Sequence, residues 1–373
     1  MPRTLIAGGG IAGLTAAHAL LAAGHDVLVL ESHNSIRGSG AVLGIWPPHM
    51  AIFERFGLAD DISANSINGD QWHLWSRSGE PLRGPSFAEV TAGYRLPYST
   101  IYRPLLNRII AEPLGDRVRT DSTVIGYAEH RTHVEVRLAD GRIEEADLLV
   151  AADGIGSRIR GQMHPTAVLV DTEQVAWRGV VDPGSVSLPP RHGFVVGAAR
   201  SRGGWLRVAG GQVFWVVARF GISGPAPVEV KAEALAQVDY LDDGTWGFPL
   251  RELIKLTKAD EIHRDAIAEV PPLQSWVTSY VALIGDAAHA TSPHISSGAA
   301  YAIEDAFVLG THLAESGDVG GALRAYDLER RERMAWVRAN AQAVSKLALG
   351  ESADYGAAWV KFVGASLASA PVA

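Results

Sequence analysis

Apolar runs and glycine-rich breaks alternate along the first thirty residues. A short apolar run from residue 3 is followed by glycines and then by an Ala- and Leu-rich stretch, Ile11 to Ala23, with helical spacing. Gly24 is a typical helix stop, and Val27–Leu30 is a second apolar run. The pattern predicts a strand, a helix and a strand, the βαβ unit that opens a parallel sheet.

Between residues 31 and 150 the periodic patterns of apolar and polar residues are weaker. Pro47-Pro48 suits the first turn of a helix, and residues 103–111 also have a helical pattern. Alternation of apolar and polar residues over 133–138 predicts a strand that ends at a turn. The apolar run 148–150 predicts a buried strand that ends just before Asp153-Gly154.

Between residues 171 and 272 the pattern changes to aromatic and β-branched runs separated by glycine pairs. The clearest strands are residues 205–208 and 213–220, and helices are expected near 230–240 and 248–257. We interpret this region as a second, mostly antiparallel domain.

The C-terminal part returns to the first kind of pattern. It has an apolar strand at 281–284 and helices at about 298–315 and 320–347. We predict an α/β fold class in which a Rossmann-like domain is interleaved with a β-rich, α+β second domain and carries C-terminal helices. The predicted boundaries are 1–69, 99–171 and 273–373 for the first domain, and 70–98 and 172–272 for the second.

Composition and charge narrow the function classes. Lys and Arg number 33 against 41 Asp and Glu, a formal charge of -8, so neither a nucleic-acid surface nor a polybasic membrane patch is expected. The absence of cysteine excludes disulfides, thiolate metal sites and a cofactor linked through sulfur. The N-terminal segment lacks the apolar core of a signal peptide, and we expect a cytoplasmic protein without a membrane span.

The first candidate site is the motif Gly8-x-Gly10-x-x-Gly13, between the first strand and the first helix. Such glycines permit a tight turn, close approach of a pyrophosphate to the backbone, and close packing of helix on strand. Glu31, at the end of the second strand, has the position of a carboxylate that binds ribose hydroxyls. We predict a dinucleotide site that includes Ala12, although glycines in turns are the simpler alternative.

The second candidate site follows the apolar strand at 281–284. Gly285-Asp286 comes directly after this strand, Pro293 lies eight residues beyond Gly285, and a helix is expected to begin near Ser297-Gly298-Ala299. An Asp at a strand end can accept a bond from a cofactor hydroxyl, and the N-terminus of a helix can stabilise negative charge. The alternative is a strand-to-helix turn that Asp caps.

A third segment, Asp153-Gly154-Ile155-Gly156-Ser157-Arg158, also follows an apolar strand. The order of the three segments, completed by Glu304-Asp305-Ala306, resembles that of the group A FAD-dependent monooxygenases. This family includes salicylate, 4-hydroxybenzoate and urate hydroxylases. The resemblance covers residues 3 to 335.

The resemblance implies that noncovalently bound FAD occupies the first domain and that the second is a substrate domain. It further implies NADH or NADPH as cosubstrate and O2 as oxidant. Oxygen would add to the flavin as a C4a-hydroperoxyflavin, which hydroxylates a small planar aromatic or heteroaromatic substrate. FAD contacts are implied for residues in the family's motifs: Gly40, Ala41, Arg103, Asp153, Gly154, Gly285, Asp286, Pro293, Ser297, Gly298 and Ala299.

One departure from the family lies before the helix at Gly298. Many relatives have Pro-x-x-Gly-Gln-Gly with an Asn two residues later, whereas this chain has Pro293-His294-Ile295-Ser296-Ser297-Gly298-Ala299-Ala300. Serine is a good N-cap, so the helix can still begin here. The missing Gln and Asn side chains predict altered contacts with the flavin.

Two groups of histidines have both a chemical and a simpler interpretation. His49, beside Trp46 in a segment expected near the flavin ring, could deprotonate a phenol or could be an ordinary histidine at a helix start. His289 and His294 have no third ligand in a recognisable pattern, so no metal site is predicted.

The strands of the second domain supply the candidate pocket residues. Arg207, Phe214 and Trp215 are predicted to line the pocket, with Arg207 and Trp215 proposed as catalytic, because aromatic walls suit a planar substrate. Side chains alternate along a strand, so about half of such residues must face away. The arginine group 330–333 is predicted to be a solvated helical face.

Two alternatives to hydroxylation stay open. The same flavin chemistry could end in epoxidation, Baeyer-Villiger insertion, oxidative decarboxylation or dearomatisation. A flavoprotein that binds a ligand without turnover is the non-enzymatic alternative. We expect a monomer or a homodimer.

Overall fold

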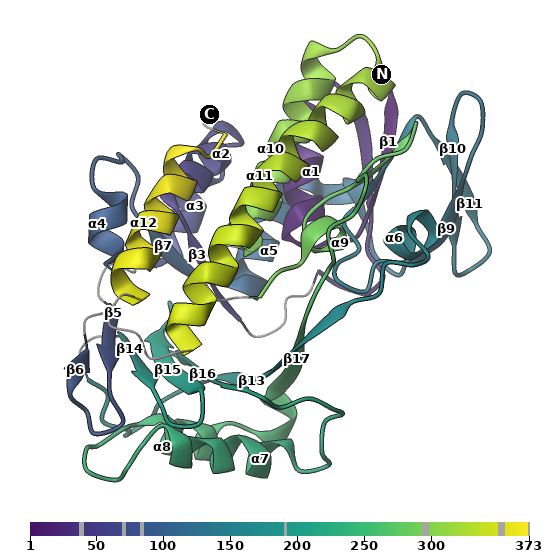
Figure 1. Ribbon diagram of the computed structural model, residues 1–373. Helices are drawn as coiled ribbons and strands as arrows, with labels where there is room; N and C mark the ends of the chain where they lie inside the picture. The colour runs from purple at the N-terminus through teal and green to yellow at the C-terminus, as the bar shows by residue number, and fades with distance from the viewer. Residues whose placement is uncertain are drawn as a thin grey trace.

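The computed structural model describes residues 1–36, 41–68, 72–82, 86–189, 192–292, 298–349 and 355–371. Its first body is built on a five-stranded parallel sheet in the order β18-β12-β1-β2-β8 (Figure 1). The strands are β1 (Arg3–Ala7), β2 (Asp26–Leu30), β8 (Val118–Arg119), β12 (Leu148–Ala151) and β18 (Val281–Leu283).

This parallel sheet is buried because other elements cover it. Every residue of β12 and β18 is buried, as expected for parallel strands with both faces covered. Helices α1 (Ile11–Ala22) and α10 (Gly298–Glu315) pack closely, and a Cβ at Gly310 would lie 2.8 Å from the Cβ of Ala19. Next to the sheet is an antiparallel meander of β9 (Val124–Glu129), β10 (Val134–Leu138) and β11 (Ile143–Ala146).

The second body is a seven-stranded sheet in the order β17-β13-β16-β15-β14-β5-β6, antiparallel except where β5 runs parallel to β14. Helices α7 (Val230–Gln237) and α8 (Leu250–Leu256) cover its lower face in Figure 1. The strands are β5 (Trp72–Trp75), β6 (Pro81–Leu82), β13 (Val170–Val181), β14 (His192–Val196), β15 (Ser201–Arg207), β16 (Val213–Phe220) and β17 (His263–Glu269).

The remaining elements complete the first body and its C-terminal layer. A small antiparallel sheet joins β3 (Val42–Ile45), β7 (Ser99–Tyr102) and β4 (Ile67–Asn68). The helices are α2 (Pro47–Arg55), α3 (Ala59–Ala64), α4 (Phe87–Thr91), α5 (Arg103–Ala111), α6 (Arg158–Met163), α9 (Asp286–His289), α11 (Val319–Leu349) and α12 (Tyr355–Ala368), with 3-10 turns at Glu112–Arg117, Val238–Tyr240 and Ala259–Glu261.

An aromatic cluster joins segments that are distant in sequence. The ring of Phe87 lies 5.5 Å from that of Trp46, 4.8 Å from that of Tyr98 and 4.9 Å from that of Trp359, measured between centroids. The helix α4 therefore packs on the first body, although residues 70–98 were all expected in the second domain. The other proposed boundaries stay predictions.

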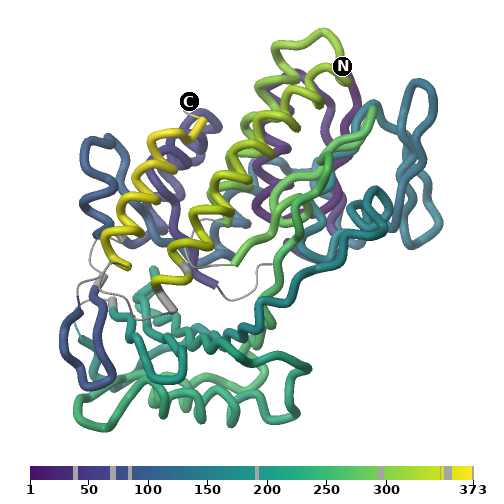
Figure 2. Tube along the Cα trace, in the orientation of Figure 1, coloured from purple at the N-terminus to yellow at the C-terminus, as the bar shows by residue number. Residues whose placement is uncertain are grey.

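Two long strands connect the bodies. β13 and β17 pair over most of their length, and Figure 2 shows the two traces running side by side from the first body into the second. The predicted mixed α/β class with a parallel sheet, further β-sheets and C-terminal helices is confirmed. Within the described ranges, no helix has the length and apolar character needed to cross a bilayer.

Candidate active site

The three motif glycines after β1 have different surroundings. Gly8 has a φ of +106°, and a Cβ there would lie 2.4 Å from the carbonyl oxygen of Ala152. A Cβ at Gly13 would lie 2.0 Å from the carbonyl oxygen of Gly8. A Cβ at Gly10 would meet nothing within 4 Å. Gly8 and Gly13 are therefore required by the protein's own packing, whereas Gly10 borders open space that a ligand can fill.

The N-terminus of α1 begins at this open space. Its N-cap is Gly10, which has no side chain to cap the helix, and the first turn contains no acidic residue. The amides of the first turn lack helical acceptors and the helix dipole is positive here, so the site suits an anion such as a pyrophosphate. The residues present thus fit the predicted dinucleotide.

Glu31 is fixed beside this turn by backbone amides. Its Oε2 accepts a bond from the Gly9 N–H at 2.7 Å, and its Oε1 accepts one from the His33 N–H at 2.8 Å. Burial raises the pKa of Glu31, but the bonds from His33, Ser32 and Gly9 outweigh burial and hold it below its ordinary value. The ionised carboxylate keeps capacity to accept ribose hydroxyls and disfavours a phosphate at the same place.

Asp153 lies next to the glycine turn, because the Cα of Asp153 would be 3.3 Å from a Cβ at Gly8. Its Oδ2 accepts a bond from the Arg158 N–H at 2.9 Å, which ties the carboxylate to the start of α6. Its Oδ1 is buried and has no partner among the described residues. Gly154 follows with a φ of +76°. The free oxygen is a candidate acceptor for a cofactor hydroxyl.

The second motif meets the first. A Cβ at Gly285 would lie 2.9 Å from the Cβ of Ala12, so the two turns are in contact, and the φ of Gly285 is +58°. Asp286 is the first residue of α9 and is exposed. The N–H of Gly285 donates to Oδ2 of Asp305 at 2.7 Å. A carboxylate of α10 therefore fixes the turn that presents Asp286.

Arg103 links the cofactor turns to the second body. Its N–H donates to the carbonyl of Ala41 at 2.9 Å, which brings these two predicted FAD contacts together. Burial lowers the pKa of Arg103, the charges of Asp286 and Asp265 raise it, and that of Arg178 lowers it. Arg178 and Asp265 form an ion pair of 2.9 Å between β13 and β17. These four charged side chains mark the junction of the two bodies.

A buried ionic network contacts the second motif through Asp305. Arg330 of α11 donates through Nε to Asp305 at 2.7 Å and through Nη1 to Glu304 at 2.8 Å. Nε2 of His289 lies 2.6 Å from Oδ2 of Asp305. Burial raises the pKa of Asp305, but the charges of His289 and Arg330 hold it below its ordinary value. Burial also raises the pKa of Glu304, but the charge of Arg330 and the hydrogen bonds from His49 and Arg333 hold it below its ordinary value, so both carboxylates are ionised.

The network shows that the arginines of α11 were predicted wrongly, and it includes His49. The arginine group on α11 is not wholly a solvated face, because Arg330 is 0% exposed and Arg333 donates to Glu304 at 2.6 Å. His49 is 2% exposed, and its Nε2 lies 3.2 Å from Oε1 of Glu304. This position favours a structural role for His49, and its role as a base stays a prediction.

On the side of the seven-stranded sheet turned away from α7 and α8, a small apolar cluster forms a wall toward the first body. Phe214 and Leu206 pair across β16 and β15, and they pack with Val180 and with Val42 of β3 in the first body. Phe214 therefore faces the first body, and its predicted place in a substrate pocket stays a prediction.

Two other predicted wall residues lie elsewhere. Trp215 is 0% exposed and packs in the core between the sheet and the helices α7 and α8. It donates from Nε1 to Thr257 at 2.8 Å. Arg207 shares the face of Trp205, away from the wall, and donates to the carbonyl of Pro189 at 3.3 Å. The prediction that both line the pocket is therefore corrected, because the alternation along a strand places them on the helix-covered face.

Arg202 was not predicted, yet strand alternation places it with Leu206 on the face of β15 turned away from α7 and α8. Its guanidinium carbon lies 5.3 Å from the ring centroid of Tyr355, at the start of α12. Burial lowers the pKa of Arg202, and the hydrogen bond with Tyr355 raises it. The pair places a cation and a phenol on the same side of the sheet as the apolar wall.

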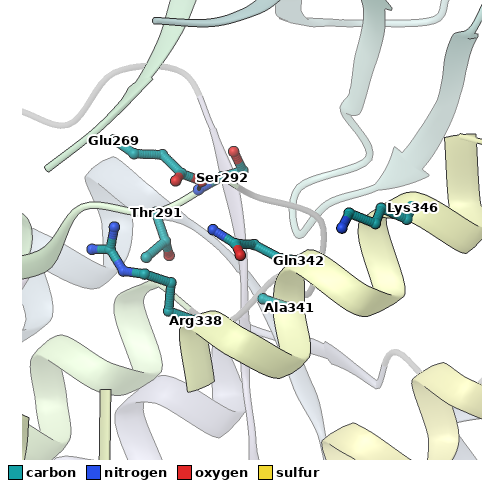
Figure 3. A pocket seen from close by; sticks show the side chains of 7 residues that line it. All are labelled: Glu269, Thr291, Ser292, Arg338, Ala341, Gln342 and Lys346. Carbon is teal, nitrogen blue, oxygen red and sulfur yellow. Dashed lines mark hydrogen bonds between the residues drawn. The ribbon is translucent and has the colours of Figure 1, made fainter. Parts of the chain in front are cut away.

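A cavity of about 200 Å³ opens between α11 and the segment after α9 (Figure 3). Arg338, Gln342 and Lys346 line it at intervals of four residues along α11, so they share one helical face. Thr291 and Ser292 line the other side, with Glu269, which accepts a bond from the Ser292 N–H at 2.9 Å. The cavity is rich in hydrogen-bond donors and carries more positive than negative side chains.

Three predicted contacts, Gly40, Pro293 and Ser297, lie outside the described residues, as do His294 and Ser296. Gly298 and Ala299 begin α10, whose first turn has no acidic residue. The dipole of this 18-residue helix therefore favours negative charge at its N-terminus.

Comparisons with known proteins agree with this arrangement. A family model described as an FAD binding domain matches residues 2–341. The chain is 31% identical to the FAD-dependent urate hydroxylase of Klebsiella oxytoca over 345 residues, which cover 89% of this chain and 86% of that protein. It is 33% identical to the 3-amino-4-hydroxybenzoate 2-monooxygenase PtnB3 of Streptomyces platensis, with 89% and 85% covered.

A solved structure shows the same architecture. Klebsiella pneumoniae HpxO, complexed with FAD and uric acid, is similar with a TM-score of 0.86 and 26% sequence identity. The match covers 99% of this chain and 97% of that chain.

Proposed function

Because the chain belongs to the group A FAD-dependent monooxygenases, we propose that it uses NADH or NADPH and O2 to hydroxylate a small, planar, anionic aromatic or heteroaromatic compound. The observation that carries the substrate class is the wall of the second sheet. It combines the apolar surface of Phe214 and Leu206 with the cation of Arg202. A flat ring can pack on the apolar surface, and a carboxylate or a deprotonated ring can pair with the cation.

FAD, when bound, accepts a hydride from the cosubstrate and activates O2. The residues of this chain bind and orient it. The amides at the N-terminus of α1 bind the pyrophosphate, Glu31 accepts ribose hydroxyls, and Asp286 accepts a hydroxyl of the ribityl chain. Asp305 holds the backbone of Gly285 and so fixes the direction of Asp286.

The apolar wall and Arg202 hold the substrate and exclude water. Phe214, Leu206 and Val180 present apolar surface toward the first body. Burial strengthens the attraction between Arg202 and an anion, because few water molecules screen it. The phenol of Tyr355 hydrogen-bonds Arg202 and so restricts the position of the guanidinium.

A substrate panel with paired charges tests this proposal. Phenols, benzoates and nitrogen heterocycles are each compared with a neutral amide or ester analogue, while NADH or NADPH oxidation is followed. We expect oxidation to accelerate with anionic compounds and an oxygenated product to form. Equal stimulation by neutral analogues would contradict the anionic class, and a product without added oxygen would contradict hydroxylation.

Arg202→Gln tests the role of the cation directly. We expect the KM for an anionic substrate to rise by about tenfold, equivalent to about 1.4 kcal/mol, and the KM for its neutral analogue to stay nearly constant. Arg200→Gln is the matched control, because Arg200 is exposed two residues away and carries the same charge. A similar rise in both variants would indicate a general electrostatic effect.

The donor-rich cavity beside α11 is our candidate for the phosphate-bearing part of NADH or NADPH. Its lining contains none of the residues of the pocket wall, and Thr291 follows Asp286 by only five residues. Lys346→Gln is expected to raise the Kd of the reduced nucleotide severalfold, because one cation is lost. Anaerobic reduction of the bound flavin measures this Kd. Lys361→Gln is the control, because Lys361 is an exposed lysine of α12. Equal Kd values for the two variants would exclude the cavity as the nucleotide site.

A further inference from the structure

The hairpin between β9 and β10 carries three side chains with metal-binding atoms on one face. The N–H of His130 donates to the carbonyl of His133 at 2.9 Å, which closes a loop of two residues. His133 directly precedes β10, and Glu135 is two residues further on, so both side chains share one face of the hairpin. His130 lies opposite His133 and completes the group.

The side chains converge. The rings of His130 and His133 are stacked, with centroids 4.6 Å apart and an interplanar angle of 16°. Nε2 of His130 lies 3.2 Å from Oε2 of Glu135. The ligand atoms of all three residues lie within 4.8 Å of one another.

These separations are close to those of a metal centre. A tetrahedral ion about 2.0–2.2 Å from its ligands holds them roughly 3.3–3.6 Å apart. The pair of His130 and Glu135 has a separation of 3.2 Å, and the ligand atoms of the other two pairs lie within 4.8 Å, so ion binding requires these two pairs to move closer together.

We propose that His130, His133 and Glu135 bind one divalent first-row transition-metal ion, such as Zn²⁺ or Ni²⁺, with water completing the coordination. Two imidazoles and one carboxylate favour these ions over Mg²⁺ and Ca²⁺, which prefer oxygen ligands. In Figure 1 the hairpin lies at the edge of the first body, far from the seven-stranded sheet. The proposed metal site therefore lies apart from the proposed substrate wall.

The ion would act on a segment that leads to the cofactor turn. Oε1 of Glu129 accepts bonds from the Thr278 hydroxyl at 2.7 Å and from the Tyr280 N–H at 2.9 Å. The Tyr280 hydroxyl donates to the carbonyl of Arg131 at 2.7 Å. These residues precede β18, so an ion that joins β9 to β10 stabilises the support of this strand.

Calorimetric titration of the FAD-loaded protein, prepared without a polyhistidine tag and freed of metal, tests the proposal. We expect one equivalent of Zn²⁺ or Ni²⁺ to bind and Mg²⁺ to give no saturable signal. The double variant His130→Asn/His133→Asn is expected to lose this equivalent, and Glu135→Gln to bind at least tenfold more weakly. Zn²⁺ is also expected to raise the Tm of the wild type and not that of the double variant.

His312→Asn is the matched control. His312 and Glu329 form a two-residue pair, with 2.8 Å between Nε2 and Oε2, outside the three-residue group. We expect its titration to equal that of the wild type. The proposal is overturned if the wild type binds no ion, if the double variant keeps the equivalent, or if the control loses it. The visible flavin spectrum and circular dichroism show that each variant is folded.

Discussion

Gly10 and Gly13 belong to one motif but have different physical roles. Gly13 allows α1 to pass within contact distance of the backbone of Gly8, whereas Gly10 leaves space at the helix N-terminus. The sequence predicted the motif as a unit because glycine spacing reports backbone constraints. It could not separate a glycine required by the protein from one required by a ligand, since this depends on which atoms lie nearby.

Gly10→Ala and Gly13→Ala separate these roles. We expect Gly10→Ala to fold normally and to bind FAD at least about tenfold more weakly, a loss of about 1.4 kcal/mol, because its Cβ enters the cofactor space. Gly13→Ala is expected to lose both FAD and folded protein. Flavin fluorescence titration and thermal unfolding measure the two effects. Normal FAD affinity in Gly10→Ala would place the pyrophosphate elsewhere.

Arg330 shows what the sequence pattern missed at the residue scale. Its neighbours are charged, and a charged run on a helix is usually solvated. The pattern could not reveal that Glu304 and Asp305, within an apolar helix, face Arg330 and make it a buried counter-ion. Two adjacent acids in such a helix were the available signal for a buried cation.

Arg330→Met is expected to destabilise the protein by about 3–5 kcal/mol, because two buried carboxylates lose a partner. Arg324→Met on the same helix is the control. Its pair with Asp318 is exposed and 3.7 Å long, so a change of about 0–1 kcal/mol is expected. Urea unfolding measures both. Equal effects would show that the network contributes no more than a surface ion pair.

Among the secondary-structure elements, β15 and β16 show why the sequence could not decide which of their residues face the first body. Both faces of their sheet are covered, one by α7 and α8 and the other by the first body. Large apolar residues therefore occupy both faces, and polarity no longer distinguishes them. Phe214 and Trp215 are consecutive and must point in opposite directions, so only one could line the pocket.

Phe214→Leu and Trp215→Phe form a matched pair on β16. We expect Phe214→Leu to change the KM of the substrate severalfold and to cost less than about 1.5 kcal/mol of stability. Trp215→Phe is expected to cost about 1–3 kcal/mol, because the bond to Thr257 is lost in the core, and to leave the KM unchanged. A larger KM change in Trp215→Phe would reverse the two faces.

In the molecule as a whole, the proposed site lies where the two interleaved bodies meet. β13 and β17 carry Arg178 and Asp265 to the junction, where they act on Arg103 beside Asp286. The parallel sheet, its motifs and the second sheet were predictable, because local periods and glycine spacing encode them. The contact of Ala12 with Gly285 and the pairing of Arg202 with Tyr355 join residues more than 100 positions apart, and one sequence does not report such contacts.

We propose that this chain transfers one oxygen atom from O2 to an anionic aromatic substrate. Turnover of the best compound from the panel under ¹⁸O₂, followed by mass spectrometry of the product, tests it most directly. We predict a product that is heavier by one ¹⁸O atom and consumption of one NADH or NADPH for each molecule formed. A product that takes its oxygen from water, or nucleotide consumption that yields only hydrogen peroxide with every substrate, would contradict the claim.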